Sequence, residues 1–211
     1  MIWERVVFCD FDGTITVEET FVGMLKQFAP ELSAELMPQM YAKKLTLREG
    51  VRQLLESIPS ERYLEIIEYS RGKLIRPGLV ELLDFLEAKG VPFVIVSGGI
   101  RIMVEAVLGP LVERVQAIYA VEIETSNSRL QVRSPFEGGS ELVSKVRVMA
   151  EYQAEEQVAI GDSITDLNMA LAAPVVFARD RLAEYLDEEE KSYIWWNDFF
   201  DVLESLAQRW N

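Results

Sequence analysis

A short apolar strand that ends in two acidic residues constrains this chain more than any other feature. Residues Val6–Cys9 are all apolar and mostly β-favouring, which predicts a strand buried on both faces. Gly13 is a turn signal, so the strand should end before it. Asp10 and Asp12 then lie at the strand end, where both can face one crevice while Phe11 points into the core.

Two carboxylates this close together repel each other, so either one is protonated or a cation lies between them. A hard divalent cation such as Mg²⁺ suits ligands that are all oxygen. Asp10 and Asp12 therefore indicate a magnesium site. An acidic turn without any function is the alternative that this pair of residues alone leaves open.

Composition narrows the chemistry that the chain can perform. Its 211 residues suffice for one domain, or for a domain that carries a smaller insertion. The net charge of −14 argues against nucleic-acid binding, and it means that a local cation must attract any anionic substrate. The absence of histidine excludes Ser-His-Asp catalysis, Cys-His catalysis and histidine-bound zinc, and leaves acid–base work to Asp, Glu, Lys or Tyr.

The expected location is the cytoplasm. The chain shows no signal-peptide pattern and no apolar stretch long enough to cross a bilayer. Its single cysteine, Cys9, allows no internal disulfide and fits a reducing compartment. Because Cys9 lies in a predicted buried strand, we expect an inert core thiol rather than a nucleophile.

Strands that alternate with helices predict the fold class. Further strands are expected at 93–96, 117–123, 129–133, 157–160 and 175–178, and helices at 79–89, 102–108, 141–152 and 167–171. This alternation is typical of an α/β protein with a Rossmann-like parallel sheet between two helical layers. The side chains expected to close the C-terminal core are Trp195, Trp196, Phe199, Phe200 and Leu203.

Residues 16–74 differ from their surroundings because they are helical in pattern and contain no convincing strand. A capping box at Thr46–Glu49 should open one helix, while Ala29–Pro30 and Pro38 should interrupt others. The pattern predicts a helical cap over 16–74, inserted after the first strand of a core formed by 1–15 and 75–211.

Polar motifs follow three of the predicted strands. They are Asp10–Thr14, Ser97–Gly99 and Gly161–Asp166. Since ligands bind at the carboxyl ends of parallel strands, the fold should bring these motifs together. With Lys145, they resemble in order and spacing the four motifs of the haloacid dehalogenase superfamily, in its phosphatase branch. The helical insertion between the first two motifs is similar to that of the phosphoserine-phosphatase-like subfamily.

This resemblance implies a role for each motif residue. Asp10 would attack phosphorus, and Asp12 would protonate the leaving oxygen and later activate water. Mg²⁺ would be bound by the carboxylates of Asp10 and Asp162 and by the backbone carbonyl of Asp12. Ser97, Gly98 and Lys145 would bind the phosphoryl oxygens. Asp166 and Thr14 would support the site from outside the metal's own ligands.

Gly161–Thr165 also resembles the nucleophile block of GDSL-type esterases, in which Ser163 would be the nucleophile. Those enzymes need a histidine base, and this chain has none. We therefore reject that interpretation and expect Ser163 to be dispensable.

Two substrates are compatible with the family resemblance. The stretches Asp12–Thr16, Phe28–Pro30, Leu45–Val51 and Phe177–Asp180 resemble phosphatases of methionine salvage, which hydrolyse 2-hydroxy-3-keto-5-methylthiopentenyl-1-phosphate. The alternative is phosphoserine, for which Glu19 and Arg52 lie where that family recognises the substrate's ammonium and carboxylate groups.

A non-catalytic phosphate-binding module is a distant third alternative, because fold does not fix function. The expected partner is a small phosphorylated metabolite, with neither nucleic acid nor membrane. The chain is expected to be a monomer or a homodimer.

Overall fold

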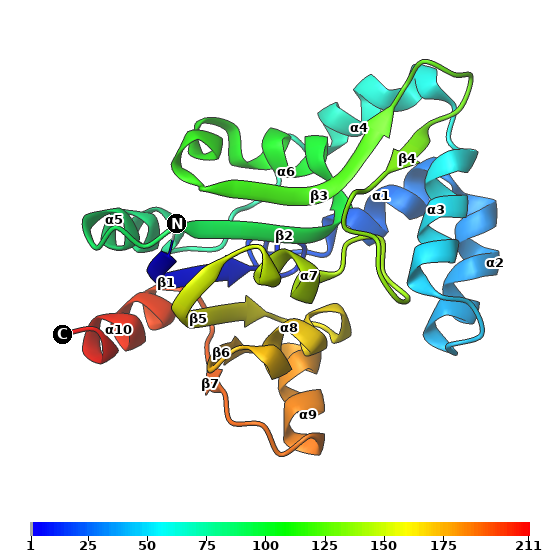
Figure 1. Ribbon diagram of the computed structural model, residues 1–211. Helices are drawn as coiled ribbons and strands as arrows, with labels where there is room; N and C mark the ends of the chain where they lie inside the picture. The colour runs from blue at the N-terminus through cyan, green and yellow to red at the C-terminus, as the bar shows by residue number, and fades with distance from the viewer. Residues whose placement is uncertain (1) are drawn as a thin grey trace.

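A seven-stranded sheet lies at the centre of the molecule (Figure 1). The computed structural model describes residues 2–211, so Met1, the first residue of the predicted segment 1–15, lies outside the described residues. The strands are β1 (Ile2–Cys9), β2 (Phe93–Ile100), β3 (Ala117–Glu124), β4 (Gln131–Arg133), β5 (Gln153–Gly161), β6 (Val175–Ala178) and β7 (Ile194–Trp195). Their order is β4-β3-β2-β1-β5-β6-β7, and only the β3–β4 pair is antiparallel.

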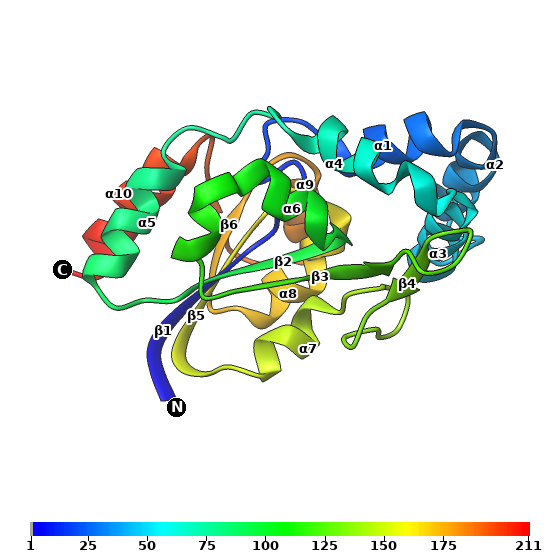
Figure 2. The same cartoon turned by 90° about the horizontal axis from the view of Figure 1, so that it is seen from above.

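Helices cover both faces of this sheet (Figure 2). In the central strand β1, Val7 and Cys9 belong to one hydrophobic core and Val6 and Phe8 to the other. The first core includes α5 (Leu79–Ala88), α6 (Arg101–Leu108) and α10 (Phe199–Arg209). The second includes α7 (Lys145–Ala150), α8 (Leu167–Ala172) and α9 (Asp180–Glu188). The predicted three-layer α/β fold is therefore confirmed.

The first four of the five α-helices between β1 and β2 in the sequence gather at the end of the sheet toward which β1 points (Figures 1 and 2). They are α1 (Thr20–Phe28), α2 (Pro30–Tyr41), α3 (Leu47–Ser57) and α4 (Tyr63–Ser70). The predicted capping box is present, since the Thr46 hydroxyl accepts from the Glu49 amide and the Glu49 carboxylate accepts from the Thr46 amide. The division into a cap of 16–74 and a core of 1–15 and 75–211 stays a prediction.

The hairpin that β3 and β4 form is joined to these helices by backbone hydrogen bonds. The Ser60 amide donates to the Ser128 carbonyl at 3.0 Å, and the Leu130 amide donates to the Ile58 carbonyl at 3.0 Å. The Arg48 amide donates to the Ser140 carbonyl, in the loop after β4, at 2.7 Å. The helical segment is thus attached to the edge of the sheet at several places.

Two helix predictions are wrong. The sequence predicts a helix over 141–152, but α7 covers only Lys145–Ala150. The residues before it are not helical, because Glu141 forms an isolated β-bridge with Gly138 and the Ser144 amide donates to the Phe136 carbonyl. Pro38 was expected to interrupt a helix, but α2 continues through it. Its buried side chains on either side of Pro38, including Leu36 and Met40, hold the helix in place despite the missing donor.

The strands and the C-terminal core also differ from prediction. β2 continues through Ser97 to Ile100, and β5 begins at Gln153, because both strands pair with long neighbours. Trp196 and Phe199 are fully buried as expected, whereas Trp195 and Phe200 are 61% and 47% exposed. None of the helices in the part of the chain that the structure describes is both long and apolar enough to span a membrane.

Candidate active site

The strand register places the three predicted motifs side by side. Cys9 of β1 is paired with Ile95 of β2 on one side and with Ile160 of β5 on the other. Asp10 directly follows β1, while Ser97 within β2 and Asp162 directly after β5 each lie one residue beyond the level of Asp10. Since all three strands are parallel, their side chains share one edge of the sheet.

A buried lysine connects the first and last motifs. The Lys145 ammonium forms ion pairs with Asp10 Oδ1 and with Asp166 Oδ1. All three side chains are at most 5% exposed. Burial alone would lower the pKa of Lys145, but the two carboxylates raise it above its ordinary value, so the side chain stays charged.

Asp162 is held by the first motif. The Thr14 hydroxyl donates to Asp162 Oδ1 at 2.7 Å, although the two residues belong to different ends of the chain. Gly13 lies against the same carboxylate, with a φ of +86°, and a Cβ atom there would come within 2.6 Å of Asp162 Oδ2. Position 13 thus requires glycine both for its backbone conformation and for space.

Asp166 organises the turn that follows β5. Its Oδ2 accepts hydrogen bonds from the amides of Asp162 and Ser163, both at 3.0 Å. Since Oδ1 is paired with Lys145, both of its oxygens have protein partners. Asp166 thus fixes both the Lys145 ammonium and the backbone of the turn that carries Asp162.

The acidic cluster suits a divalent cation. Carboxylate oxygens of Asp10, Asp162 and Asp166 all lie within 4.8 Å of one another. Lys145 balances one of these charges, so two negative charges are left in a buried site. An all-oxygen cluster with that excess fits Mg²⁺.

Burial shifts the pKa values of these carboxyls upward. Burial and the nearby charge of Asp166 raise the pKa of Asp10 well above its ordinary value, against the opposing effect of Lys145. Burial and Asp166 likewise raise the pKa of Asp162 to about 7, although the Thr14 hydrogen bond opposes the shift. The protein without metal therefore favours protonation where a cation could bind.

The Asp12 side chain is separate from the acidic cluster. Its Oδ1 accepts from the amide and the hydroxyl of Thr20, both at 2.5 Å, and the amide of Phe21 lies 3.1 Å from each carboxylate oxygen. Burial raises the pKa of Asp12 to about 6, against the opposing hydrogen bonds from Thr20 and Phe21. Asp12 can thus carry a proton near pH 6, apart from the cluster of Asp10, Asp162 and Asp166 that could bind a cation.

Ser97 and an apolar hollow lie beside Asp12. The Ser97 hydroxyl, which is 1% exposed, accepts from the Gly99 amide at 3.0 Å, while Gly98 is exposed. The hollow is lined by Phe11, Asp12, Thr20, Phe21, Ser97, Gly99, Ile100, Met103 and Val104. Most of these side chains are apolar, and the hollow is too small to admit a water molecule, so Asp12 borders a closely packed apolar region.

The structure does not bring Glu19 and Arg52 into this cluster. Glu19 is exposed just before α1. The Arg52 guanidinium is half-buried and forms ion pairs with Glu56 and Glu137, and it also donates to the Val132 carbonyl at 3.1 Å. Arg52 therefore joins α3 to the segment around β4.

Sequence reasoning did not include Thr20, which holds the Asp12 carboxylate through two donors. The sequence shows only a hydroxyl residue directly before the apolar positions Phe21, Met24, Leu25 and Phe28. Residues of this kind usually cap the helix that they precede, so nothing in the sequence pointed to a contact with Asp12. In this protein, the Thr20 hydroxyl binds a side chain instead.

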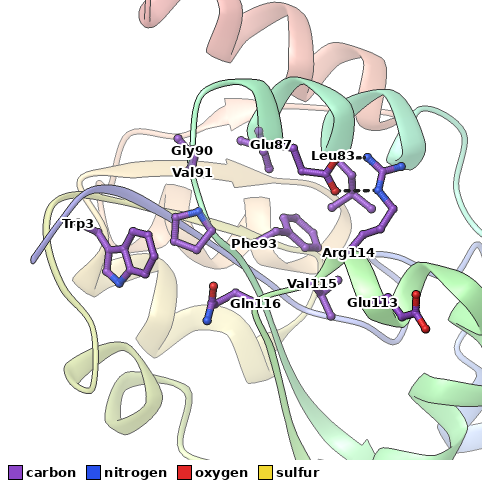
Figure 3. Close-up of a pocket in the computed structure, with 12 residues that line it drawn as sticks. Trp3, Leu83, Glu87, Gly90, Val91, Phe93, Glu113, Arg114, Val115 and Gln116 are labelled. Carbon is purple, nitrogen blue, oxygen red and sulfur yellow. Dashed lines mark hydrogen bonds and ion pairs between the residues drawn. The ribbon is translucent and has the colours of Figure 1, made fainter. Parts of the chain in front are cut away.

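A separate cavity of about 330 Å³ lies at the opposite end of the sheet (Figure 3). Trp3 at the beginning of β1 and Phe93 at the beginning of β2 line it, so it lies far along the strands from Asp10. Its arginine, Arg114, is paired with Asp84 and Glu87. Nothing in this cavity adds to the acidic cluster.

The fold, the order of the motifs and the acidic cluster all point to the same family of hydrolases. Residues 7–171 match the model of the haloacid dehalogenase-like hydrolases, and the chain belongs to that family. The predicted resemblance is therefore confirmed.

Relatives refine this assignment. A 2-hydroxy-3-keto-5-methylthiopentenyl-1-phosphate phosphatase of Microcystis aeruginosa (strain NIES-843 / IAM M-2473) is 56% identical over 97% of this chain and 99% of its own. A protein of the same name from Bacillus cereus (strain AH187) is 34% identical over 95% of this chain and 94% of its own. A substrate-bound phosphoserine phosphatase structure has a TM-score of 0.68 at 20% identity, covering 97% of this chain and 99% of that one, and shares the fold.

Proposed function

We propose that this chain is a Mg²⁺-dependent phosphomonoesterase that uses Asp10 as its nucleophile. The observation that carries the proposal is the buried cluster of Asp10, Asp162 and Asp166, in which the Lys145 ammonium pairs with Asp10 and Asp166. Such a cluster combines a nucleophile, a cation site and a fixed positive charge, which are the parts that phosphoryl transfer needs.

Each proposed step is assigned to a residue of this chain. An Asp10 carboxylate oxygen attacks phosphorus, the bond to the leaving oxygen breaks, and Asp12 gives its proton to that oxygen. This leaves an aspartyl-phosphate on Asp10 and a carboxylate at Asp12. Asp12 then takes a proton from water, whose oxygen attacks phosphorus, and phosphate leaves with Asp10 regenerated.

The surrounding groups stabilise negative charge during both steps. Bound by Asp10, Asp162 and the Asp12 carbonyl, Mg²⁺ would supply positive charge to the phosphoryl oxygens. The Lys145 ammonium, the Ser97 hydroxyl and backbone amides near Gly98 would bind the same oxygens. Asp166 and Thr14 would keep Lys145 and Asp162 in place.

We propose 2-hydroxy-3-keto-5-methylthiopentenyl-1-phosphate as the substrate, in methionine salvage. Two relatives that match nearly the whole chain carry that name. Arg52, the group expected to bind the carboxylate of phosphoserine, is already paired with Glu56 and Glu137.

The test is phosphate release by the purified chain from this substrate, from phosphoserine and from a panel of other phosphoesters, with Mg²⁺ and with EDTA. We expect metal-dependent turnover that is fastest with the methylthio enol phosphate and is lost in Asp10→Asn. The matched control is Ser163→Ala, which should keep most activity. Absence of turnover on every compound would favour the non-catalytic phosphate-binding alternative.

We further propose that residues 16–74 act as a cap that encloses a small phosphorylated metabolite and excludes bulk water. The high acidic charge supports a partner that is neither nucleic acid nor an anionic membrane surface. We propose that the protein acts in the cytoplasm. We also propose that it is a monomer or a homodimer, and size-exclusion chromatography with light scattering would distinguish these two states.

A further inference from the structure

We infer that Arg76 is a positioning residue of the candidate active site, an inference that rests on the proposed function. Arg76 lies between α4 and α5, after the helical segment returns to the sheet. Its Nε donates to the Thr14 carbonyl at 2.9 Å, and its Nη2 donates to the Gly13 carbonyl at 2.7 Å and to the Thr16 carbonyl at 3.3 Å. Its backbone amide donates to the Ile15 carbonyl at 2.8 Å.

Four consecutive carbonyls of the loop after β1, those of residues 13–16, thus receive hydrogen bonds from one residue. Arg76 is 8% exposed, and within residues 2–211 its guanidinium binds only backbone carbonyls. A buried cation without a carboxylate partner is uncommon, because burial disfavours charge. The fixed fork of five donors suits this place, because it spreads the donors over three nitrogens, whereas the three donors of a lysine share a single nitrogen.

The loop that Arg76 holds is the one that orients Asp162. Gly13 lies against the Asp162 carboxylate, and the Thr14 hydroxyl donates to it. Arg76 donates to the carbonyls of these same two residues. We therefore infer that Arg76 acts through Gly13 and Thr14 to set the direction of the Asp162 carboxylate, without contact with substrate.

A third segment supports Arg76 from the C-terminal part of the chain. Its guanidinium lies 5.4 Å from the centre of the buried Trp196 ring, and Nη1 donates to the Asn197 carbonyl at 3.4 Å. Arg179 makes the equivalent contacts, at 5.3 Å from the Trp196 ring and 2.7 Å from the Asn197 carbonyl. Arg179 has no hydrogen bond to residues 13–16 among the described residues, so it provides a matched control.

The experiment compares Arg76→Met, Arg76→Lys and Arg179→Met with the wild-type chain. Mg²⁺ affinity is measured by calorimetry without substrate, and amide hydrogen exchange is measured at residues 13–16 in the metal-free protein. In Arg76→Met we expect Mg²⁺ affinity and kcat to fall about 10- to 100-fold, the range typical of residues that orient metal ligands, while KM changes little. Exchange at Ile15 and Thr16 should be faster than in Arg179→Met.

Arg76→Lys keeps the positive charge but loses the fork of donors. Its Mg²⁺ affinity and its exchange rates at residues 13–16 should therefore lie between those of the wild type and of Arg76→Met. It serves as the test variant if Arg76→Met does not fold. Wild-type Mg²⁺ affinity in both Arg76 variants, or exchange at 13–16 no faster than in Arg179→Met, would overturn the inference. If the wild-type chain binds Mg²⁺ but hydrolyses no phosphoester, the proposed function is wrong. The positioning role of Arg76 is still tested in that case by Mg²⁺ affinity and amide exchange. If the wild-type chain binds no Mg²⁺, the exchange comparison decides.

Discussion

The Thr14 hydroxyl donates a 2.7 Å hydrogen bond to Asp162 Oδ1, across 148 positions of sequence. Both residues are buried, at 0% and 6% exposure, so this contact is shielded from competing water. It joins the loop after β1 to the turn after β5 in the place where a cation would bind. The first and last motifs of the chain are therefore physically connected before any ligand arrives.

Replacing Thr14 with valine should weaken Mg²⁺ binding. The change keeps the shape of the side chain but leaves the Asp162 carboxylate without its hydroxyl donor. We expect about a 10- to 100-fold loss of Mg²⁺ affinity by calorimetry. Thr14→Ser, which retains the hydroxyl, should stay close to wild type, and equal losses in both variants would contradict this account.

Asp10→Asn should abolish turnover. The amide is neither a nucleophile for phosphorus nor an anionic metal ligand, and loss of a nucleophile commonly lowers kcat by about 10⁴-fold or more. Steady-state phosphate release measures the effect, and circular dichroism checks the fold. Substantial residual activity in a folded variant would show that another group attacks phosphorus.

Without metal, stability should rise as the pH falls from about 8 to about 5. The folded-state pKa values of Asp162 and Asp12, about 7 and about 6, lie above the ordinary value of 3.8. A raised folded-state pKa favours folding at low pH, and that contribution is lost as the pH rises through 6 and 7. Melting temperatures in EDTA across this range measure the effect, and Asp162→Asn should give a flatter profile.

Mg²⁺ should raise the melting temperature more at pH 8 than at pH 5. Protons and the cation compete for the same carboxylates, so binding to the ionised cluster restores the stability that is lost at high pH. A metal effect that is equal at both pH values would argue against Asp162 as a ligand.

Lys145→Met should destabilise the fold as well as remove activity. The change leaves Asp10 and Asp166 buried without their cation, and breaking such a pair typically costs about 3–5 kcal/mol. Urea unfolding measures this loss. Because Mg²⁺ can replace part of the missing charge, saturating metal should recover some stability in the variant.

Arg52→Ala distinguishes the two substrates. If the chain hydrolyses the methylthio enol phosphate, the change should affect kcat/KM only modestly, because Arg52 is paired with Glu56 and Glu137. Glu137→Gln should then produce a similar effect. A collapse of phosphoserine hydrolysis in Arg52→Ala, but not in Glu137→Gln, would instead favour a carboxylate-binding role.

The sequence was sufficient to predict six of the seven strands, all except β7, and the gathering of their motifs. Continuous apolar runs such as Val6–Cys9 have few alternatives to a buried parallel strand, and parallel strands bring their carboxyl ends to one edge. Asp10, Ser97 and Asp162 could thus be grouped without coordinates.

The sequence could not predict which side chains would be satisfied by distant backbone groups. Arg76 appears in the sequence as one basic residue beside Pro77, and its role depends on carbonyls more than 60 positions away. Arg52 is a comparable case, since its partner Glu137 lies 85 positions further along. Local pattern carries no information on such pairs, because packing of the whole chain creates them.

Backbone hydrogen bonds join the helical segment 16–74 to the chain around β3 and β4, and they affect how a metabolite could enter the site. They are the bonds of the Arg48, Ser60 and Leu130 amides described above. If α3 moves away from the sheet, the hairpin of β3 and β4 must either travel with it or give up these bonds. Two segments would then govern the entry and exit of a metabolite. One is the set of helices α1–α4, which precedes β2 in the sequence, and the other is the β3–β4 hairpin, which follows it. A change in the turn at 126–128, remote from Asp10, could therefore set how fast product escapes.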